Sequence, residues 1–404
     1  MGLNNLLQDK IQREAVQAWI DSGKYASIVM ATGTGKTFVF LHALHSMKKN
    51  DDVHVFIAEV VDREKDLDND IIKYDKLFGT NTYKDYDLKF STYQSMYKVK
   101  DYKFGLVCCD EAHFHLSPEY YKFHINNEYK ALLCITATTE SHIEYEIDGK
   151  IINKGQLLDK IAPICFTYTI AQAKKDGIGR LLNIYVIETE LDSVNKTIKA
   201  GNAKKPFYQT EKAAYEYWDK EHKRSWFIED KELKEFKIRT TATKRSQILY
   251  NLPSKITNTK ILLNNINGKS IIFGNSLDSL IQVTPNVISS RNSDDKNNLV
   301  RKAFENDEIN DIGSFKKLLQ GINLPRLDNC ILMSYYTSEG QAVQRLGRLR
   351  KNGDKVGSVF IFLTKDTQEV KWYNSMIQEL SEFNFIKCEG IDDCIKQYKL
   401  NETN

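Results

Sequence analysis

The residues best suited to chemistry lie in a glycine-rich loop, Ala31-Thr32-Gly33-Thr34-Gly35-Lys36-Thr37. The loop follows an apolar run at 25–31 and precedes a helix-like stretch, KTFVFLHALHSMKK. Glycines let a backbone approach an anion and turn its N–H groups inward, and a helix N-terminus adds its dipole. The lysine of such a loop supplies a cation to the β and γ phosphates, and the next hydroxyl can ligate Mg²⁺. The loop therefore predicts a nucleotide site with Lys36 on the phosphates and Thr37 on the metal.

A pair of carboxylates ends a second apolar run. Asp110-Glu111-Ala112-His113 comes directly after FGLVCC, 74 residues beyond Lys36 (110 − 36). A strand that ends in Asp beside a phosphate loop brings a carboxylate to the metal, and an adjacent Glu can orient or deprotonate an attacking water. We therefore expect Asp110 to hold Mg²⁺ through its water shell and Glu111 to position the hydrolytic water.

Two further motifs are less specific by themselves. Thr136-Ala137-Thr138 ends an apolar run, where open α/β sheets place ligands, although taken alone the motif is interpreted as a strand cap. The basic stretch at 344–351, QRLGRLRK, would suit an arginine finger, but a solvated helical face explains a basic helix as well.

These motifs need a scaffold in which apolar runs alternate with helix-like stretches. Runs that are apolar on both faces, separated by helices, predict a parallel sheet covered by helices. The chain holds two such regions, so the fold class is α/β. We expect strands at 25–31, 53–59, 88–93, 104–110 and 129–138, and again at 269–274, 285–290, 310–315, 329–335 and 356–364.

The charge of the chain is uneven. Its formal net charge is +3, yet residues 171–260 hold 19 Lys and Arg against 12 Asp and Glu, so this segment carries +7 (19 − 12) and the remainder −4 (3 − 7). The basic residues are interleaved with aromatic ones, as in KKPFYQTEKAAYEYWDKEHKRSWFIED. A surface that contacts phosphates and stacks bases is one interpretation, with Lys204 and Lys205 as candidate contacts. A helical linker that packs its aromatic side chains against the core is the other.

Composition limits the class of protein. The chain has 404 residues, 41% of them hydrophobic and 27% charged, which excludes wholesale disorder. We expect no membrane span and no secretory signal, because no apolar stretch is long enough and the N-terminus is polar. Seven cysteines without a CxxC pair indicate reduced thiols in a cytoplasmic protein and no structural zinc.

The motifs together resemble those of superfamily 2 helicases and translocases. ATGTGKT is similar to motif I, DEAH to motif II, TAT to motif III and QRLGRLRK to motif VI. Their order and approximate spacing match over about residues 8–364. The wording of motifs II and VI is most similar to the DNA-acting branch, which includes phage branch-migration helicases, excision-repair helicases and the motor subunits of type III restriction enzymes.

The resemblance implies two RecA-like parallel-sheet domains in tandem, with a largely helical basic insert between them. On this pattern residues 1–165 form RecA-like domain 1, 166–265 the basic connecting segment, 266–364 RecA-like domain 2 and 365–404 a helical C-terminal tail. ATP and Mg²⁺ are the implied cofactors.

The family pattern also assigns roles to residues. The implied nucleotide contacts are Gln12, Thr32, Gly33, Thr34, Gly35, Lys36, Thr37, Gly321, Asn323, Arg345 and Arg348. The implied catalytic residues are Lys36, Asp110, Glu111, Arg345 and Arg348. Residues expected to couple the motifs are His113, Thr136, Thr138 and Gln344. Expected strand contacts are Arg63, Thr92, Tyr93, Gln94, Gly274 and Asn275. The chain departs from the pattern at Gln320, where motif V usually has an acidic residue, and at Arg350, which comes one position early in motif VI.

The expected function is an ATP-dependent helicase or translocase that moves along or unwinds single-stranded or branched DNA in replication, recombination or repair. We expect a monomer in a bacterial cell or a phage-infected host. The alternatives are an ATPase that remodels protein–nucleic-acid complexes without unwinding, an RNA helicase, and a regulatory protein with a degenerate ATPase.

Overall fold

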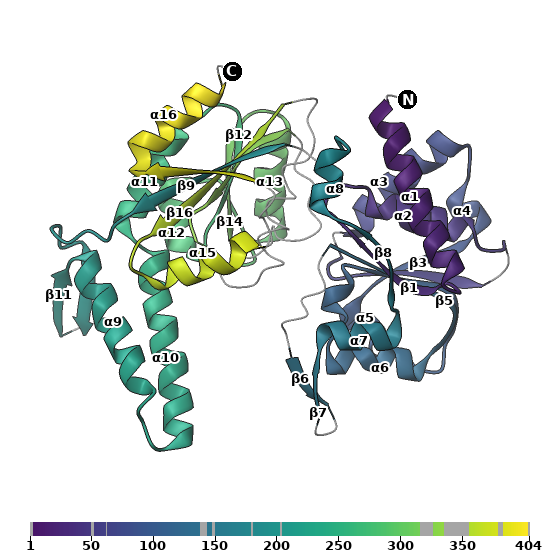
Figure 1. Cartoon of the computed structure of the whole chain (residues 1–404), viewed down its shortest axis with the longest axis horizontal. Coiled ribbons are helices and arrows are strands. Elements are labelled where there is room, and N and C mark those ends of the chain that lie inside the picture. The colour runs from purple at the N-terminus through teal and green to yellow at the C-terminus, as the bar shows by residue number, and fades with distance from the viewer. Residues whose placement is uncertain are drawn as a thin grey trace. The chain divides into compact units, whose positions relative to one another are not determined.

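The computed structural model describes residues 3–49, 52–61, 63–137, 144–147, 150–178, 181–202, 204–315, 326–334, 355–378 and 383–402. The described residues up to 178 form one folded unit, and almost all of those from 181 onward form a second (Figure 1). Each unit is built on a parallel sheet of apolar strands covered by helices. The expected α/β fold class is therefore confirmed.

The sheet of the first unit has six parallel strands in the order β3-β2-β4-β5-β1-β8. Its strands are β1 (Tyr25–Met30), β2 (Val53–Ala58), β3 (Asp87–Thr92), β4 (Lys103–Asp110), β5 (Glu128–Thr136) and β8 (Ile164–Tyr168). A separate antiparallel ribbon joins β6 (Glu144–Ile147) to β7 (Lys150–Asn153). The helices are α1 (Leu3–Asp21), α2 (Lys36–His45), α3 (Arg63–Phe78), α4 (Thr82–Asp85), α5 (Tyr93–Met96), α6 (Pro118–Asn126), α7 (Lys154–Ile161) and α8 (Ile170–Lys175), with a short 3₁₀ turn η1 (Ala112–Phe114).

Alternation along β4 divides the core of this unit in two. Leu106 and Cys108 face the cluster formed with α1, α2 and α3, whereas Val107 and Cys109 face the cluster formed with α5, α6 and α7. Successive side chains of a strand point to opposite faces, so a strand buried on both faces must be apolar throughout. The same alternation sets Asp110, the last residue of β4, on the opposite side of the sheet from Cys109.

The sheet of the second unit has seven parallel strands in the order β13-β14-β12-β15-β16-β9-β17. The strands are β9 (Leu182–Thr189), β12 (Lys269–Phe273), β13 (Val287–Ser289), β14 (Asp311–Phe315), β15 (Leu327–Leu332), β16 (Gly357–Thr364) and β17 (Asn384–Glu389). Its covering helices are α11 (Pro253–Leu263), α12 (Leu277–Val283), α13 (Asp294–Glu305), α15 (Gln368–Gln378) and α16 (Gly390–Glu402).

The basic segment is less helical than the sequence suggested. Strand β8 joins the first sheet and β9 the second, and β10 (Ile198–Asn202) pairs with β11 (Lys205–Gln209) in a hairpin. The helices α9 (Glu211–Ser225) and α10 (Lys231–Tyr250) then form an antiparallel arm that extends from the second unit (Figure 1). The expected helical tail likewise contains a strand, because β17 adds to the free edge of β9.

Candidate active site

The glycine loop has the backbone that its sequence predicts. Gly33 and Gly35 have φ of +82° and +83°, a region that side chains disfavour, and α2 begins at the next residue, Lys36. The carboxamide of Gln12 on α1 donates from Nε2 to the carbonyl oxygens of Thr34 (3.0 Å) and Gly35 (3.3 Å). A Cβ on Gly35 would lie 2.3 Å from that nitrogen. Helix α1 therefore clamps the loop through Gln12, which is 2% exposed.

The lysine of the loop is paired with the glutamate that follows β4. Lys36 Nζ lies 2.7 Å from Glu111 Oε1, and Glu111 itself has a positive φ of 50°. Burial opposes ionisation of Glu111, but the charges of Lys36 and His113 outweigh it and lower its pKa to about 2. Glu111 is therefore a carboxylate at neutral pH, able to accept a hydrogen bond from water.

Arg63, the first residue of α3, lies between the two side chains expected to hold Mg²⁺. Its Nε donates to Asp110 Oδ2 at 2.9 Å and its terminal nitrogen to Thr37 Oγ1 at 2.7 Å. We expected Arg63 to contact a nucleic-acid strand, whereas the structure places its guanidinium in the active site. The arginine supplies a positive charge where Thr37 and Asp110 converge, so both could bind a cation once it withdraws.

A buried hydrogen bond joins the ends of two neighbouring strands. His113 Nδ1 and Thr136 Oγ1 are 2.9 Å apart, and both side chains are fully buried. Lys154, the first residue of α7, donates from Nζ to the carbonyl of His113 at 2.9 Å. The structure thus brings together two of the residues expected to couple the motifs. Nothing in the sequence pointed to Lys154, which is 41 residues from His113 and meets it only in the fold.

Tyr93 is placed differently from our expectation. It is 2% exposed, and its hydroxyl donates to the backbone carbonyl of Asp110 at 2.7 Å. Tyr93 therefore supports the backbone that carries the Asp110 carboxylate and has no exposed surface for a nucleic-acid strand to contact. Thr92 is half-buried and within 3.1 Å of the Ser95 hydroxyl, while Gln94 is exposed.

The candidate strand contacts of the second unit are of two kinds. Gly274 is buried, and a Cβ there would lie 2.9 Å from Leu280 Cγ, so close packing of α12 explains this glycine without a ligand. The backbone N–H of Asn275 donates to Ser334 Oγ at 2.7 Å. Lys204 and Lys205 are exposed on the β10–β11 hairpin.

The remaining expected site residues lie outside the described part of the chain. They are Thr138, Gly321, Asn323, Gln344, Arg345 and Arg348.

Comparison with known proteins finds a family model and a relative that this chain resembles. Residues 6–141 match the family described as type III restriction enzyme, res subunit. Over 403 residues the chain is 26% identical to the DNA 3′-5′ translocase XPB2 of Sulfurisphaera tokodaii, with 91% of this chain and 84% of that protein covered. The family model and XPB2 both support a superfamily 2 helicase or translocase that hydrolyses ATP, which the chain resembles.

Other similar proteins match over a smaller part of the chain or at lower identity. An uncharacterized putative helicase of Acanthamoeba polyphaga mimivirus is 27% identical over 236 residues, 47% of this chain and 22% of that one. The fold resembles Saccharomyces cerevisiae Dbp5 bound to RNA and ADP BeF₃, with a TM-score of 0.61, 11% identity, and 98% and 93% of the two chains covered. It also resembles the type ISP restriction-modification enzyme LlaBIII bound to DNA, with a TM-score of 0.58 and 14% identity, covering 97% of this chain and 32% of that one. These likenesses confirm the expected tandem RecA-like fold.

Proposed function

We propose that the first unit binds ATP with Mg²⁺ at the loop of 31–37 and hydrolyses it there. The observation that carries this proposal is the convergence of Lys36, Thr37, Asp110 and Glu111 from two elements far apart in sequence, with a salt bridge of 2.7 Å between Lys36 and Glu111. Gln12 fits a contact to the adenine, because its carboxamide lies against the same loop.

In this mechanism Lys36 would leave Glu111 and bind the β and γ phosphates of ATP. Thr37 and Asp110, once Arg63 has withdrawn from them, would hold Mg²⁺, which would neutralise negative charge on the phosphates. Glu111, released from Lys36, then accepts a hydrogen bond from the attacking water and positions it.

We also propose that Arg345 and Arg348 stabilise the charge that develops on the transferring phosphoryl group. Such a contribution is typically worth about 10³–10⁵ in rate. Gly321 and Asn323 would contact the nucleotide, and Thr138 and Gln344 would couple it to the strand.

DNA is the proposed substrate. XPB2 is named a DNA translocase and LlaBIII is a DNA-bound enzyme, whereas Dbp5 is bound to RNA, so RNA is the main alternative. The hairpin β10–β11 and the arm α9–α10 support a nucleic-acid surface in the basic segment, because most of their aromatic side chains are exposed, although Tyr215 and Tyr250 are buried. The exposed aromatic residues there are Phe207, Tyr208, Tyr217, Trp226, Phe227 and Phe236. Exposed rings beside lysines suit base stacking and phosphate contact.

The test is ATP turnover measured side by side with single-stranded, duplex, forked and four-way-junction DNA and with RNA of the same sequence. Stimulation by one or more DNA forms above RNA supports the proposal, and stimulation by RNA alone contradicts it. Strand-displacement and translocation assays on the stimulating form then separate unwinding from movement without unwinding. We propose a role in DNA replication, recombination or repair on the same grounds.

A further inference from the structure

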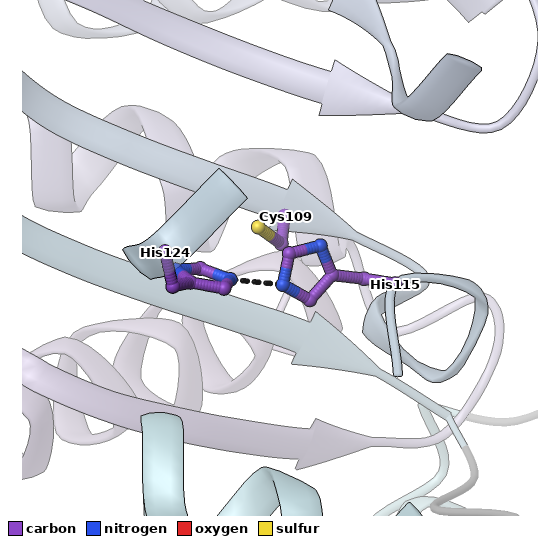
Figure 2. A group of neighbouring side chains, drawn as sticks. All are labelled: Cys109, His115 and His124. Atoms are coloured by element: carbon purple, nitrogen blue, oxygen red, sulfur yellow. Dashed lines mark hydrogen bonds between the residues drawn. The ribbon is translucent and has the colours of Figure 1, made fainter. Parts of the chain in front are cut away.

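Three potential metal ligands converge in the core of the first unit, on the face of the sheet opposite the phosphate loop. They are Cys109 near the end of β4, His115 after η1, and His124 on α6 (Figure 2). Their ligating atoms all lie within 4.8 Å of one another. We propose that this cluster is a structural metal site, and that the metal is Zn²⁺.

The orientation of the two imidazoles suits a shared ligand. Their Nε2 atoms point at each other and are joined by a hydrogen bond (Figure 2). The opposite nitrogen of His124, Nδ1, lies 2.8 Å from the hydroxyl of Tyr129. A histidine that ligates a metal through one nitrogen usually donates its other N–H to a nearby oxygen, which fixes the ring. Tyr129 supplies that oxygen for His124.

A second thiol adjoins the cluster. Cys134 on β5 is the register partner of Cys109 on β4, and the two thiols make a hydrogen bond to each other. Both side chains are fully buried and face the same apolar cluster. Two cysteines and two histidines are a set typical of tetrahedral structural zinc sites. Cys134 would complete this set by moving toward the histidines, because its sulfur is not among the atoms that lie within 4.8 Å of one another. Thiolate and imidazole donors favour Zn²⁺ over Mg²⁺, which prefers oxygen.

The cluster lies among apolar residues that include Leu116, Phe123 and Leu132. Cys109 and Cys134 would bind the ion as thiolates, and their two charges would balance that of one divalent ion in this apolar core.

The spacing of the ligands explains why the site was not predicted from the sequence. The ligands follow the pattern Cys-x₅-His-x₈-His-x₉-Cys, with one cysteine on each of two adjacent strands, and no CxxC pair occurs. We expected no structural zinc for that reason.

The site would stabilise the segment that carries the catalytic carboxylates. Residues 110–114 lie between Cys109 and His115, so a metal held by both would anchor the turn that presents Glu111 and His113. Helix α6 is attached to the same turn through His124. The role proposed for the ion is structural, because the cluster and Asp110 lie on opposite faces of the sheet.

The first experiment is metal analysis of the untagged full chain, purified without chelator or added zinc. We expect close to one equivalent of Zn²⁺. After its removal with a chelator, Co²⁺ is titrated in excess Mg²⁺, which occupies the oxygen ligands of the ATP site. Uptake of Co²⁺ should produce the intense visible bands of a tetrahedral ion and a thiolate-to-cobalt charge-transfer band, neither of which an oxygen site gives.

Variants then assign the ligands. Cys109→Ser and His124→Ala should weaken Co²⁺ binding by more than about 100-fold. Loss of a residue that only hydrogen-bonds to a ligand costs up to about 100-fold in metal affinity, and loss of the ligand itself should cost more. His124→Cys, which replaces an imidazole ligand by a thiolate, should retain the tetrahedral spectrum. The matched controls are Cys165→Ser and His45→Ala, since both residues belong to the same unit and lie outside the cluster. Circular dichroism establishes that each variant is folded.

The outcomes are distinct from those for the proposed ATPase, because metal content and the cobalt spectrum require no turnover. A folded chain without zinc that takes up no tetrahedral Co²⁺ overturns the site and leaves a Tyr129–His124–His115 hydrogen-bonded chain in its place. Equal loss of Co²⁺ in the two controls overturns it as well.

Discussion

The position of Arg63 leads to a quantitative prediction about the nucleotide-free protein. Its guanidinium bridges Asp110 and Thr37, and the side chains of Arg63 and Asp110 are only 15% and 8% exposed. Substitution of Arg63 by Gln removes the cation and leaves a buried carboxylate unpaired. We therefore expect Arg63→Gln to destabilise the nucleotide-free protein and to do so much less when Mg²⁺ and nucleotide are bound.

The magnitude follows from the burial of the pair. Breaking a buried ion pair by removal of one partner costs about 3–5 kcal/mol, and residual exposure of Arg63 favours the lower end, about 3 kcal/mol. For a folded unit of this size 1 kcal/mol corresponds to about 2–4 °C in Tm, so a fall of about 6–12 °C is expected. Bound Mg²⁺ supplies the missing positive charge beside Asp110, and the loss should then shrink below about 1 kcal/mol.

The assay is thermal and urea unfolding of both proteins, with and without saturating Mg²⁺ and a non-hydrolysable ATP analogue. Arg13→Gln is the matched control, because Arg13 pairs with Asp9 at 2.9 Å across one helical turn and its side chain is 54% exposed. An exposed pair of this kind contributes about 0.3–0.5 kcal/mol, so the control should lose little in either condition.

Two results would refute this reasoning. An equal loss of stability with and without nucleotide would mean that Mg²⁺ does not take over the position of the guanidinium. Unchanged stability combined with weaker nucleic-acid binding would mean that, in solution, Arg63 is not paired with Asp110. Arg63 would then contact the nucleic-acid strand, as the sequence suggested.

Other substitutions test the remaining parts of the site. Lys36→Ala should abolish ATP turnover, and retained turnover in a steady-state assay would exclude the phosphate-loop assignment. Glu111→Gln should still bind ATP and nucleic acid but hydrolyse ATP poorly, as equilibrium binding and single-turnover rates would show; loss of ATP binding would argue against a role in positioning water. Arg348→Ala should lower ATP turnover far more than it lowers ATP affinity. Equal losses of turnover and affinity would exclude a role for Arg348 as an arginine finger. Gly35→Ala should impair nucleotide binding, because its φ of +83° and the 2.3 Å approach to Gln12 leave no room for a Cβ; wild-type affinity would contradict that geometry.

Much of the scaffold was predictable from local pattern. All ten expected strands occur within a few residues of their predicted positions, because apolar runs of strand length separated by amphipathic helices leave few alternatives to a covered parallel sheet. The glycine loop and the carboxylates after β4 were predictable for a similar reason, since each motif is contiguous and its chemistry depends on neighbouring residues.

Pairings between distant segments were not predictable in this way. Strands β9 and β17 lie in regions that the sequence predicted to be a helical insert and a helical tail. They join one sheet because each strand satisfies backbone hydrogen-bonding groups of the other. Likewise, Tyr93 looks like a residue of a strand-contacting motif, yet the fold buries it beneath Asp110.

The sequence by itself determined that this chain has a glycine-rich loop before a helix, a pair of adjacent carboxylates after an apolar strand, and two parallel sheets, because those features are set by residue type and short-range spacing. Only the tertiary structure decided that Arg63 lies between Thr37 and Asp110, that Lys154 supports His113, and that two histidines approach a cysteine behind the candidate active site. The physical reason is the same for all three. Their side chains come from elements that are distant along the chain, and only the packing of helices against a sheet sets the distances between them.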